Sequence, residues 1–260
     1  MMDAAFNYIP SLINAYKVGH AGDHVHLGYW AQGTSYDWHT AQEAMTNLHL
    51  DALDLQDGQT VIDVGCGIGG SLRLVNGRVC DSMLIGVNID PRQLTICETH
   101  QATQGNRFDW VHCDAENVPL DHASTDRILS LEAMFHFPSR HAFLTEAARL
   151  LRPKGLLVCS DIVFEQPRTK AHQRFLDVVQ TGYAPWPAPI LCTDEMELMA
   201  QNAGLILRDL QDLTVKVRPT WDHIVSRRDD PEKSPVAAMR DLHYAGLLQY
   251  PMYVFGKLSS

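Results

Sequence analysis

The sequence predicts an α/β fold in which a mostly parallel sheet carries helices on both faces. Short apolar, β-branched runs alternate with longer helical patterns from residue 60 to residue 162, and the first run ends in a glycine-rich loop. The chain has 260 residues and is 45% hydrophobic, which is enough for a sizeable core. Alternating strands and helices favour parallel strands covered on both faces. In such sheets a ligand binds at the carboxyl ends of the strands.

The expected elements follow one another in a regular order. A strand at Thr60–Val64 leads through the glycine loop into a helix from about Gly70. Pro91 favours the start of the second helix, because its fixed backbone angle suits a first helical position. The remaining expected elements are strand Met83–Asn88, a helix from Pro91 to about Thr103, strands Arg107–Cys113 and Arg127–Glu132, helix Ser139–Leu151, strand Leu156–Ile162 after a turn at Pro153–Gly155, helix Thr193–Ala203, and strands Leu205–Val217 and Met252–Phe255.

Two segments that flank this core are expected to cover it. Residues 1–55 form a helical N-terminal arm, interrupted by the aromatic segment His24–Trp30. Residues 56–260 form the core, with a substrate-covering insertion at about 164–249. The insertion includes a helical pattern near Thr169–Thr181 and a proline-rich loop around Trp186. Both segments are rich in Trp, Tyr, Pro and His, which favours an apolar acceptor pocket beneath them.

Charge and composition argue against several classes of protein. The formal net charge is −10 at pH 7, whereas a duplex-binding protein needs a basic face, so nucleic acid is not an expected partner. No stretch approaches the ~18 apolar residues of a membrane helix, and the segment from Met1 to Tyr16 lacks a secretory signal pattern. The six cysteines include no CxxC pair and are expected to be reduced thiols. We expect a cytoplasmic protein that acts on a small molecule, alone or as a homo-oligomer.

The loop Gly65–Gly70 fits the pattern G-x-G-x-x-G after a strand. A nicotinamide enzyme would carry an acid about 20 positions further on for the ribose hydroxyls, but the second strand ends in Asn88. Asp63 lies two residues before the loop, where its carboxylate attracts a ligand ammonium and repels a pyrophosphate. Gly69 lets the backbone approach a bulky amino-acid tail. The loop therefore favours a ligand with an amino-acid end.

Four stretches, at residues 61–70, 86–90, 113–119 and 150–155, together resemble the S-adenosylmethionine-dependent methyltransferases of the Rossmann-like class. The resemblance implies S-adenosyl-L-methionine as cofactor and a Rossmann-like sheet with an antiparallel last strand and a helical cover. It also implies that the glycine loop binds the methionine moiety, while later loops hold the ribose and the adenine. Many members have an acid where this chain has Asn88, but an amide can still bond a hydroxyl. The implied cofactor-binding residues are Asp63, Gly65, Cys66, Gly67, Gly69, Asn88, Ile89, Gln93, Asp114, Ala115, Glu116 and Leu131. Tyr29 is a further candidate, because its ring either attracts the sulfonium charge or belongs to the ordinary packing of the N-terminal arm.

The stretches His26–Trp30 and Leu131–Pro138 resemble small-molecule methyltransferases of natural-product pathways, including sugar O-methyltransferases and tocopherol and prenyl-diphosphate C-methyltransferases. In the sugar enzymes, a histidine and an aspartate at positions matching His136 and Asp161 serve catalysis. An alcohol acceptor must lose a proton, and a histidine is suited to take it near neutral pH. Glu132 is a third candidate, because acids at the end of a buried strand usually have a partner. It either polarises the substrate or cofactor or satisfies backbone amides of the loop. We expect transfer to a hydroxyl of a natural product, with His136 as general base and Asp161 either orienting its ring or bonding the substrate.

Other interpretations stay open from the sequence alone. In a C-methyltransferase acting on an isoprenoid, His136 or Glu132 would stabilise positive charge and then remove a proton. An NAD-dependent oxidoreductase is disfavoured by Asp63 and Asn88, and a non-catalytic binding protein by the polar groups at the strand ends. His136 could instead cap the helix that begins near Ser139. The histidines of the arm lack zinc-site spacing, so no protein-bound metal is expected, although a diphosphate substrate would carry its own magnesium.

Overall fold

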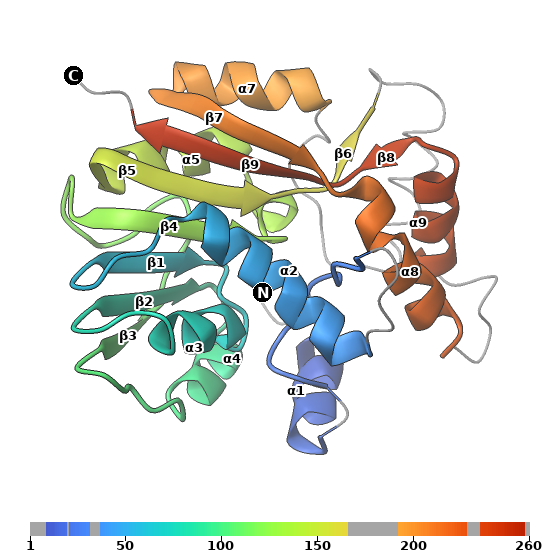
Figure 1. Ribbon diagram of the computed structural model, residues 1–260, viewed down its shortest axis with the longest axis horizontal. Coiled ribbons are helices and arrows are strands. Elements are labelled where there is room, and N and C mark those ends of the chain that lie inside the picture. Colours follow the sequence, from blue (N-terminus) through green and yellow to red (C-terminus); the bar gives the residue numbers. More distant parts are fainter. Residues whose placement is uncertain (1–8, 20, 32–36, 166–191, 228–234, 258–260) are drawn as a thin grey trace.

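The computed structural model describes residues 9–19, 21–31, 37–165, 192–227 and 235–257, and a mixed sheet lies at its centre (Figure 1). The strands are β1 Thr60–Val64, β2 Met83–Asn88, β3 Arg107–His112, β4 Thr125–Leu131, β5 Leu151–Ser160, β7 Leu205–Asp212 and β9 Pro251–Lys257. Their order is β3-β2-β1-β4-β5-β9-β7. Strands β1 to β5 pair in parallel, whereas β9 is antiparallel to both β5 and β7. Among the described residues, β6 Val163–Phe164 and β8 Leu248–Gln249 form a separate two-stranded sheet. The expected fold class is confirmed.

Helices cover both faces of the sheet because successive strand residues point to opposite sides. On β1, Val61 packs into the cluster that contains residues of α2, α3 and α8, while Ile62 packs into the cluster that contains residues of α5 and α7. Leu84 and Ile85 of β2 divide in the same way. The helices are α1 Ile9–Lys17, α2 Trp38–Ala52, α3 Gly70–Asn76, α4 Pro91–Cys97, η2 Met134–His136, α5 Arg140–Leu150, α7 Thr193–Asn202, α8 Thr214–Val225 and α9 Pro235–Tyr244.

Three boundaries differ from the sequence prediction by five residues or more, and several others by one or two. Helix α4 stops at Cys97 rather than near Thr103, and the chain then turns so that the His100 ring donates to the Ile68 carbonyl (2.9 Å). Strand β5 begins at Leu151 and runs through the expected turn. Strand β7 ends at Asp212 rather than Val217, because the Asp212 carboxylate accepts the backbone N–H of the first residue of α8 (2.9 Å) and starts a helix there.

The carboxyl ends of β1, β4 and β5 point toward the side of the molecule that carries α1, α8 and α9 (Figure 1). Here the N-terminal segment meets α8. The backbone N–H of Gly28 and the indole N–H of Trp30 both donate to the Thr220 hydroxyl (3.0 and 2.8 Å). Within the expected insertion, α7 and β7 belong to the layers of the central sheet. The expected helix at 169–181 and Trp186 lie outside the described residues. No described helix combines the length and hydropathy needed to cross a membrane.

Buried histidines join the N-terminal segment to α2. His26 donates from Nδ1 to the Leu27 carbonyl (2.9 Å) and accepts at Nε2 from the Thr46 hydroxyl (2.9 Å). The Thr46 oxygen then accepts from Nδ1 of His24 (3.2 Å), and His49 donates to the carbonyl of the preceding helical turn (2.9 Å). Burial is the main reason that the pKa of His24 is lowered to about 4 and those of His26 and His49 to about 3. These histidines are therefore neutral in the folded protein.

We predict that the free energy of unfolding falls as the pH drops from about 6.5 toward about 4. In this range the three histidines bind protons in the unfolded chain but stay neutral in the folded one. The contribution of these neutral histidines to the free energy of unfolding is fully present above the histidine pKa of the unfolded chain. Below that pKa it decreases by up to about 1.4 kcal/mol per pH unit for each histidine. Replacing fully buried His49 by leucine should reduce this slope by about one histidine's share. Urea unfolding at several pH values measures the slope, with exposed His122→Leu as the control. An unchanged slope in His49→Leu would contradict the prediction.

Candidate active site

The glycine loop after β1 adopts a backbone that only glycine adopts without strain. Gly65, Gly67 and Gly69 have φ values of 79°, 55° and 86°. A Cβ at Gly65 would lie 2.4 Å from the Cβ of Ala133, so that side of the loop is closed. Among the described residues, a Cβ at Gly67 would meet only Val25 within 4 Å, at 3.6 Å. The loop therefore packs tightly on the sheet while the Gly67 side keeps room for a ligand.

Asp63 lies on β1 just before this loop and is 2% exposed. Burial raises the pKa of its carboxyl group to about 7. Among the described residues, no side chain or backbone N–H bonds to the carboxylate or pairs with it. A buried acid without a protein partner gains most from a cation supplied by a ligand. The ammonium of an S-adenosylmethionine tail would supply this cation. The open side of Gly67 leaves room for that tail.

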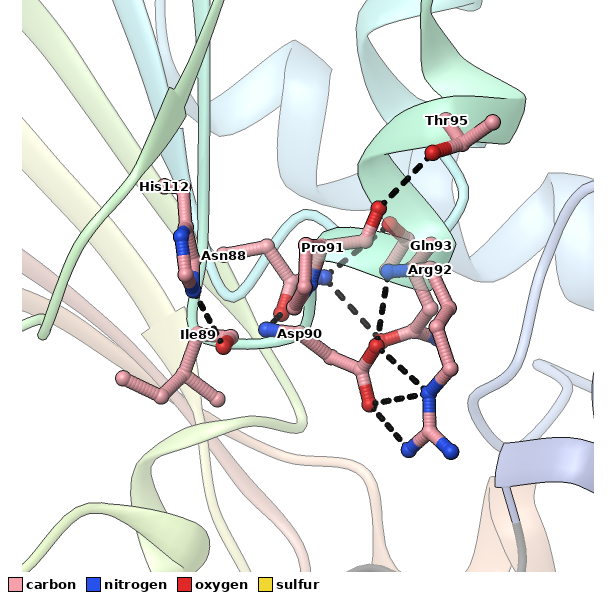
Figure 2. Close-up of polar contacts among 9 residues, drawn as sticks. Asn88, Ile89, Asp90, Pro91, Arg92, Gln93, Thr95 and His112 are labelled. Carbon is pink, nitrogen blue, oxygen red and sulfur yellow. Dashed lines mark hydrogen bonds and ion pairs between the residues drawn. The ribbon is translucent and has the colours of Figure 1, made fainter. Parts of the chain in front are cut away.

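The end of β2 is tied to the glycine loop through an amide. Asn88 donates from Nδ2 to the Gly67 carbonyl and to Oε1 of Gln93, both at 3.1 Å. Its Oδ1 accepts the backbone N–H of Asp90 (3.0 Å), and the Asp90 carboxylate caps α4 and pairs with Arg92 (2.6 Å), as Figure 2 shows. An acid at position 88 would face two oxygen acceptors. The departure from the family pattern therefore has a local cause.

The residues expected around the adenine come together in neighbouring loops after β2 and β3. His112, at the end of β3, donates to the Ile89 carbonyl (2.9 Å; Figure 2). The carboxylate of exposed Asp114 accepts the backbone N–H of Glu116 (2.9 Å), and Glu116 in turn accepts the backbone N–H of Ser139. Ala115 is buried between them. The remaining expected contacts, Cys66 and Leu131, are buried in the glycine loop and at the end of β4.

Glu132 follows β4 with an unusual backbone, at φ 54°. Its Oε2 accepts the backbone N–H of Leu27 (2.8 Å) and the hydroxyl of Tyr250 (2.7 Å). Its own N–H donates to the Ser160 hydroxyl (3.2 Å). Burial raises the pKa of the carboxyl group to about 7, against the lowering effect of the two donors. Tyr250 was absent from the sequence prediction, since no local pattern links residues 118 positions apart.

Asp161, expected beside His136, is held by another residue. Its carboxylate pairs with the guanidinium of Arg140, and the two side chains are 0% and 1% exposed. It also accepts the backbone N–H of Ile162 (2.8 Å). A buried pair of this kind fixes α5 against the end of β5. The expected role of Asp161 in orienting His136 stays a prediction.

His136 is half-buried at the end of η2, with its ring centroid 4.3 Å from that of Phe135. The capping role that the sequence left open for this histidine is filled by Ser139, whose hydroxyl accepts the backbone N–H of Ala142 (3.1 Å). His136 therefore lies in the same segment as Glu132, immediately beyond β4, and the N-cap of α5 is Ser139.

Tyr29 belongs to the segment that contacts Glu132 through Leu27. The ammonium of Lys216 on α8 lies 5.8 Å from the centre of the Tyr29 ring. The ring thus already has a cation on one face, and its expected contact with the sulfonium stays a prediction. In the described part of the chain, no three His, Cys, Asp or Glu side chains are grouped to hold a metal ion.

Comparisons with known proteins agree with this geometry. Residues 62–159 match the model of a methyltransferase domain family. The chain is 32% identical to methyltransferase GfsG of Streptomyces halstedii over 80% of this chain and 74% of that protein. It is 27% identical to the 27-O-demethylrifamycin SV methyltransferase of Amycolatopsis mediterranei, over 79% and 75% of the two chains.

The fold is shared with solved methyltransferase structures. One is the geranyl diphosphate C-methyltransferase of Streptomyces coelicolor, in complex with Mg²⁺, geranyl diphosphate and S-adenosyl-L-homocysteine. Its TM-score is 0.73 at 18% identity, covering 94% of this chain and 92% of that one. The sheet, the glycine loop and these relatives define an enzyme that transfers methyl groups. The chain belongs to the S-adenosylmethionine-dependent methyltransferases and methylates small molecules.

We predict that Gly67→Val abolishes binding of S-adenosylhomocysteine while the protein stays folded, because a side chain would fill the open side of the loop. Gly58→Val is a matched control. Gly58 has a similar φ of 74° and open surroundings, but it lies before β1, outside the loop. Both variants should lose about 1–3 kcal/mol of stability to backbone strain. Calorimetric titration measures the affinity, and unchanged binding by folded Gly67→Val would remove the loop from the site.

A second prediction concerns the charge of Asp63. Since its pKa in the free protein is about 7, S-adenosylhomocysteine should bind more tightly as the pH rises through that value and ionises the carboxyl group. Asp63→Asn should weaken binding at pH 8 by ~1.5–3 kcal/mol and flatten the pH dependence. Asp109→Asn, at an exposed position of β3, should keep the wild-type profile. Wild-type affinity that does not change with pH would contradict this assignment.

Proposed function

We propose that the enzyme methylates a hydroxyl group of a small natural product in the cytoplasm. The relative from Amycolatopsis is named for methylation at an oxygen, which supports oxygen as the acceptor atom. The cysteines of the described residues are all free thiols, as is usual in a reducing compartment. The observation that carries the proposal is the partly buried carboxyl group of Glu132, which lies beyond β4, accepts hydrogen bonds from Leu27 and Tyr250, and has a pKa raised by burial to about 7.

The bound cofactor supplies an electrophilic methyl group on a sulfonium sulfur. The acceptor hydroxyl must give up its proton as its oxygen bonds to the methyl carbon, and a base that titrates near the working pH takes it most effectively. Glu132 meets this condition because burial has raised its pKa into that range. Within the described residues, both hydrogen bonds to the Glu132 carboxylate are accepted by Oε2. Oε1 is therefore the oxygen left to accept a proton.

His136 is the second candidate for the base and the one that the sequence favoured. It follows Glu132 by four positions and lies in the same segment beyond β4. A neutral imidazole takes a proton at similar pH. We therefore assign proton removal to this segment. Glu132 is placed ahead of His136 because burial accounts for a Glu132 pKa near the working pH.

C-methylation of an isoprenoid is the alternative. In that reaction the same base would remove a proton from the carbocation that follows methyl transfer to an alkene. The likeness to the geranyl diphosphate enzyme is at 18% identity and concerns the fold. We place this alternative second, because the more similar relatives include an enzyme named for O-methylation.

We predict that Glu132→Gln lowers kcat by roughly 10²–10⁴-fold while S-adenosylhomocysteine affinity is kept, as expected for loss of a general base. The assay follows transfer of a labelled methyl group from S-adenosylmethionine to a panel of hydroxylated polyketides, sugars and terpenoids. The wild-type rate should rise with pH through about 7, since the carboxylate is the active form. Exposed Glu98→Gln is the control.

His136→Ala separates the two bases. A comparable loss in His136→Ala with Glu132→Gln near wild type would assign proton removal to His136. Full activity in both variants would show that the reaction needs no base from this segment, and the proposal would then be wrong.

A further inference from the structure

Tyr250 is fully buried between β8 and β9 and is held from several directions. Its backbone N–H donates to the Thr214 hydroxyl (2.9 Å), and its carbonyl accepts the N–H of Leu213 (2.9 Å). Both partners lie at the beginning of α8. The tyrosine ring is thus fixed by the backbone on one side, and its hydroxyl reaches Glu132 on the other (2.7 Å).

The hydrogen bonds around this hydroxyl close into a ring. The backbone N–H of Glu132 donates to the Ser160 oxygen (3.2 Å), and the Tyr250 hydroxyl donates to Oε2 of Glu132. The contact between the Ser160 and Tyr250 oxygens (3.3 Å) must then use the serine hydrogen, because the tyrosine hydrogen is already committed to the carboxylate. Each hydrogen bond in such a chain polarises the next. The bond from Ser160 to Tyr250 therefore strengthens the bond that the Tyr250 hydroxyl donates to the Glu132 carboxylate.

We propose that Tyr250 is a positioning residue for methyl transfer, which with Ser160 fixes Oε2 of Glu132 and leaves Oε1 to take the acceptor proton. The inference rests on Glu132 as the base in the proposed function. It adds a part of the chain far from the β4 segment to the machinery. Burial holds the pKa of Tyr250 well above its ordinary value, so the phenol stays protonated and remains a donor.

The groups that face Glu132 act in opposite directions. The Leu27 N–H from the N-terminal segment and the Tyr250 hydroxyl favour the ionised carboxylate. Burial and the charge of Asp161, which follows β5, oppose ionisation, although Asp161 is itself paired with Arg140 of α5. Loss of the tyrosine hydroxyl removes a favourable donor and leaves the opposing effects in place. The pKa of Glu132 should therefore rise above about 7.

Isotope-edited infrared titration tests this without an acceptor substrate. Protein labelled with ¹³C-carboxyl glutamate is titrated from about pH 5 to about pH 10, and the Glu132 band is identified by its absence in Glu132→Gln. Tyr250→Phe should raise the midpoint by about one to two pH units, the effect of one charge-assisted hydrogen bond. Ser160→Ala should shift it in the same direction by less. Tyr253→Phe is the matched control, since Tyr253 is a buried tyrosine of β9 whose hydroxyl has no partner among the described residues.

The pH–rate profile of methyl transfer gives the second measurement. In Tyr250→Phe the rising limb should move to higher pH by the same amount, with a loss of about fivefold or more at pH 7 and recovery toward the wild-type rate at high pH. A purely structural role would instead lower the rate by the same factor at every pH. A Glu132 midpoint in Tyr250→Phe equal to that of the wild type would overturn the inference. If Glu132 proves not to be the base, the infrared shift still decides whether Tyr250 controls it.

Discussion

The site depends on one physical constraint: three neighbouring strands are followed or ended by carboxyl groups that are wholly or partly removed from water. Asp63 on β1, Glu132 after β4 and Asp161 after β5 lie along the same edge of the sheet. A buried charge is costly unless it is compensated, and each acid is compensated differently. Asp161 has the guanidinium of Arg140, and Glu132 has hydrogen bonds from Leu27 and Tyr250. Asp63 has no partner from the described chain, which leaves a cationic ligand as its natural counterpart.

Local signals in the sequence predicted most of the fold. The alternation of apolar runs with helical patterns gave the parallel strands, and the glycine loop gave the ligand-bearing edge. The prediction of element boundaries from the sequence was wrong where a single polar contact opposed the hydrophobic pattern. Residues after Asp212 continue an apolar, strand-like run, but its carboxylate accepts the backbone N–H of Thr214, the first residue of α8, and the chain becomes helical there. The start of β5 was missed because the residues Pro153–Gly155 are typical of a turn. In the structure Lys154 has a positive φ (68°), but the strand continues on both sides of it.

The candidate site was predictable in its residues but not in their partners. Asp63, the glycines and Glu132 stand out because of their spacing relative to the strands. Partners of Glu132 come from an N-terminal segment 105 positions away and from a tyrosine 118 positions away, and no pattern within one element encodes either contact. Asn88 illustrates the same limit. In the sequence alone, Asn88 is a departure from a family pattern. In the fold, its amide donates hydrogen bonds to the Gly67 carbonyl oxygen and to Oε1 of Gln93, and a carboxylate at this position would repel both oxygens.

The basicity of Glu132 depends on the cover above it. A glutamate in water has a pKa of about 4.3 and is a weak base, whereas this carboxyl group reaches about 7 mainly because it is buried. Part of that burial comes from the N-terminal segment, which donates from Leu27 to Glu132 and is fastened to α8 through Gly28 and Thr220. The two donors on Oε2 lower the pKa, but burial has the larger effect. Removing the segment would expose the carboxyl group to water and lower its pKa toward that of a free glutamate, so in the proposed mechanism the same segment that shields this edge of the sheet also sets the strength of the base.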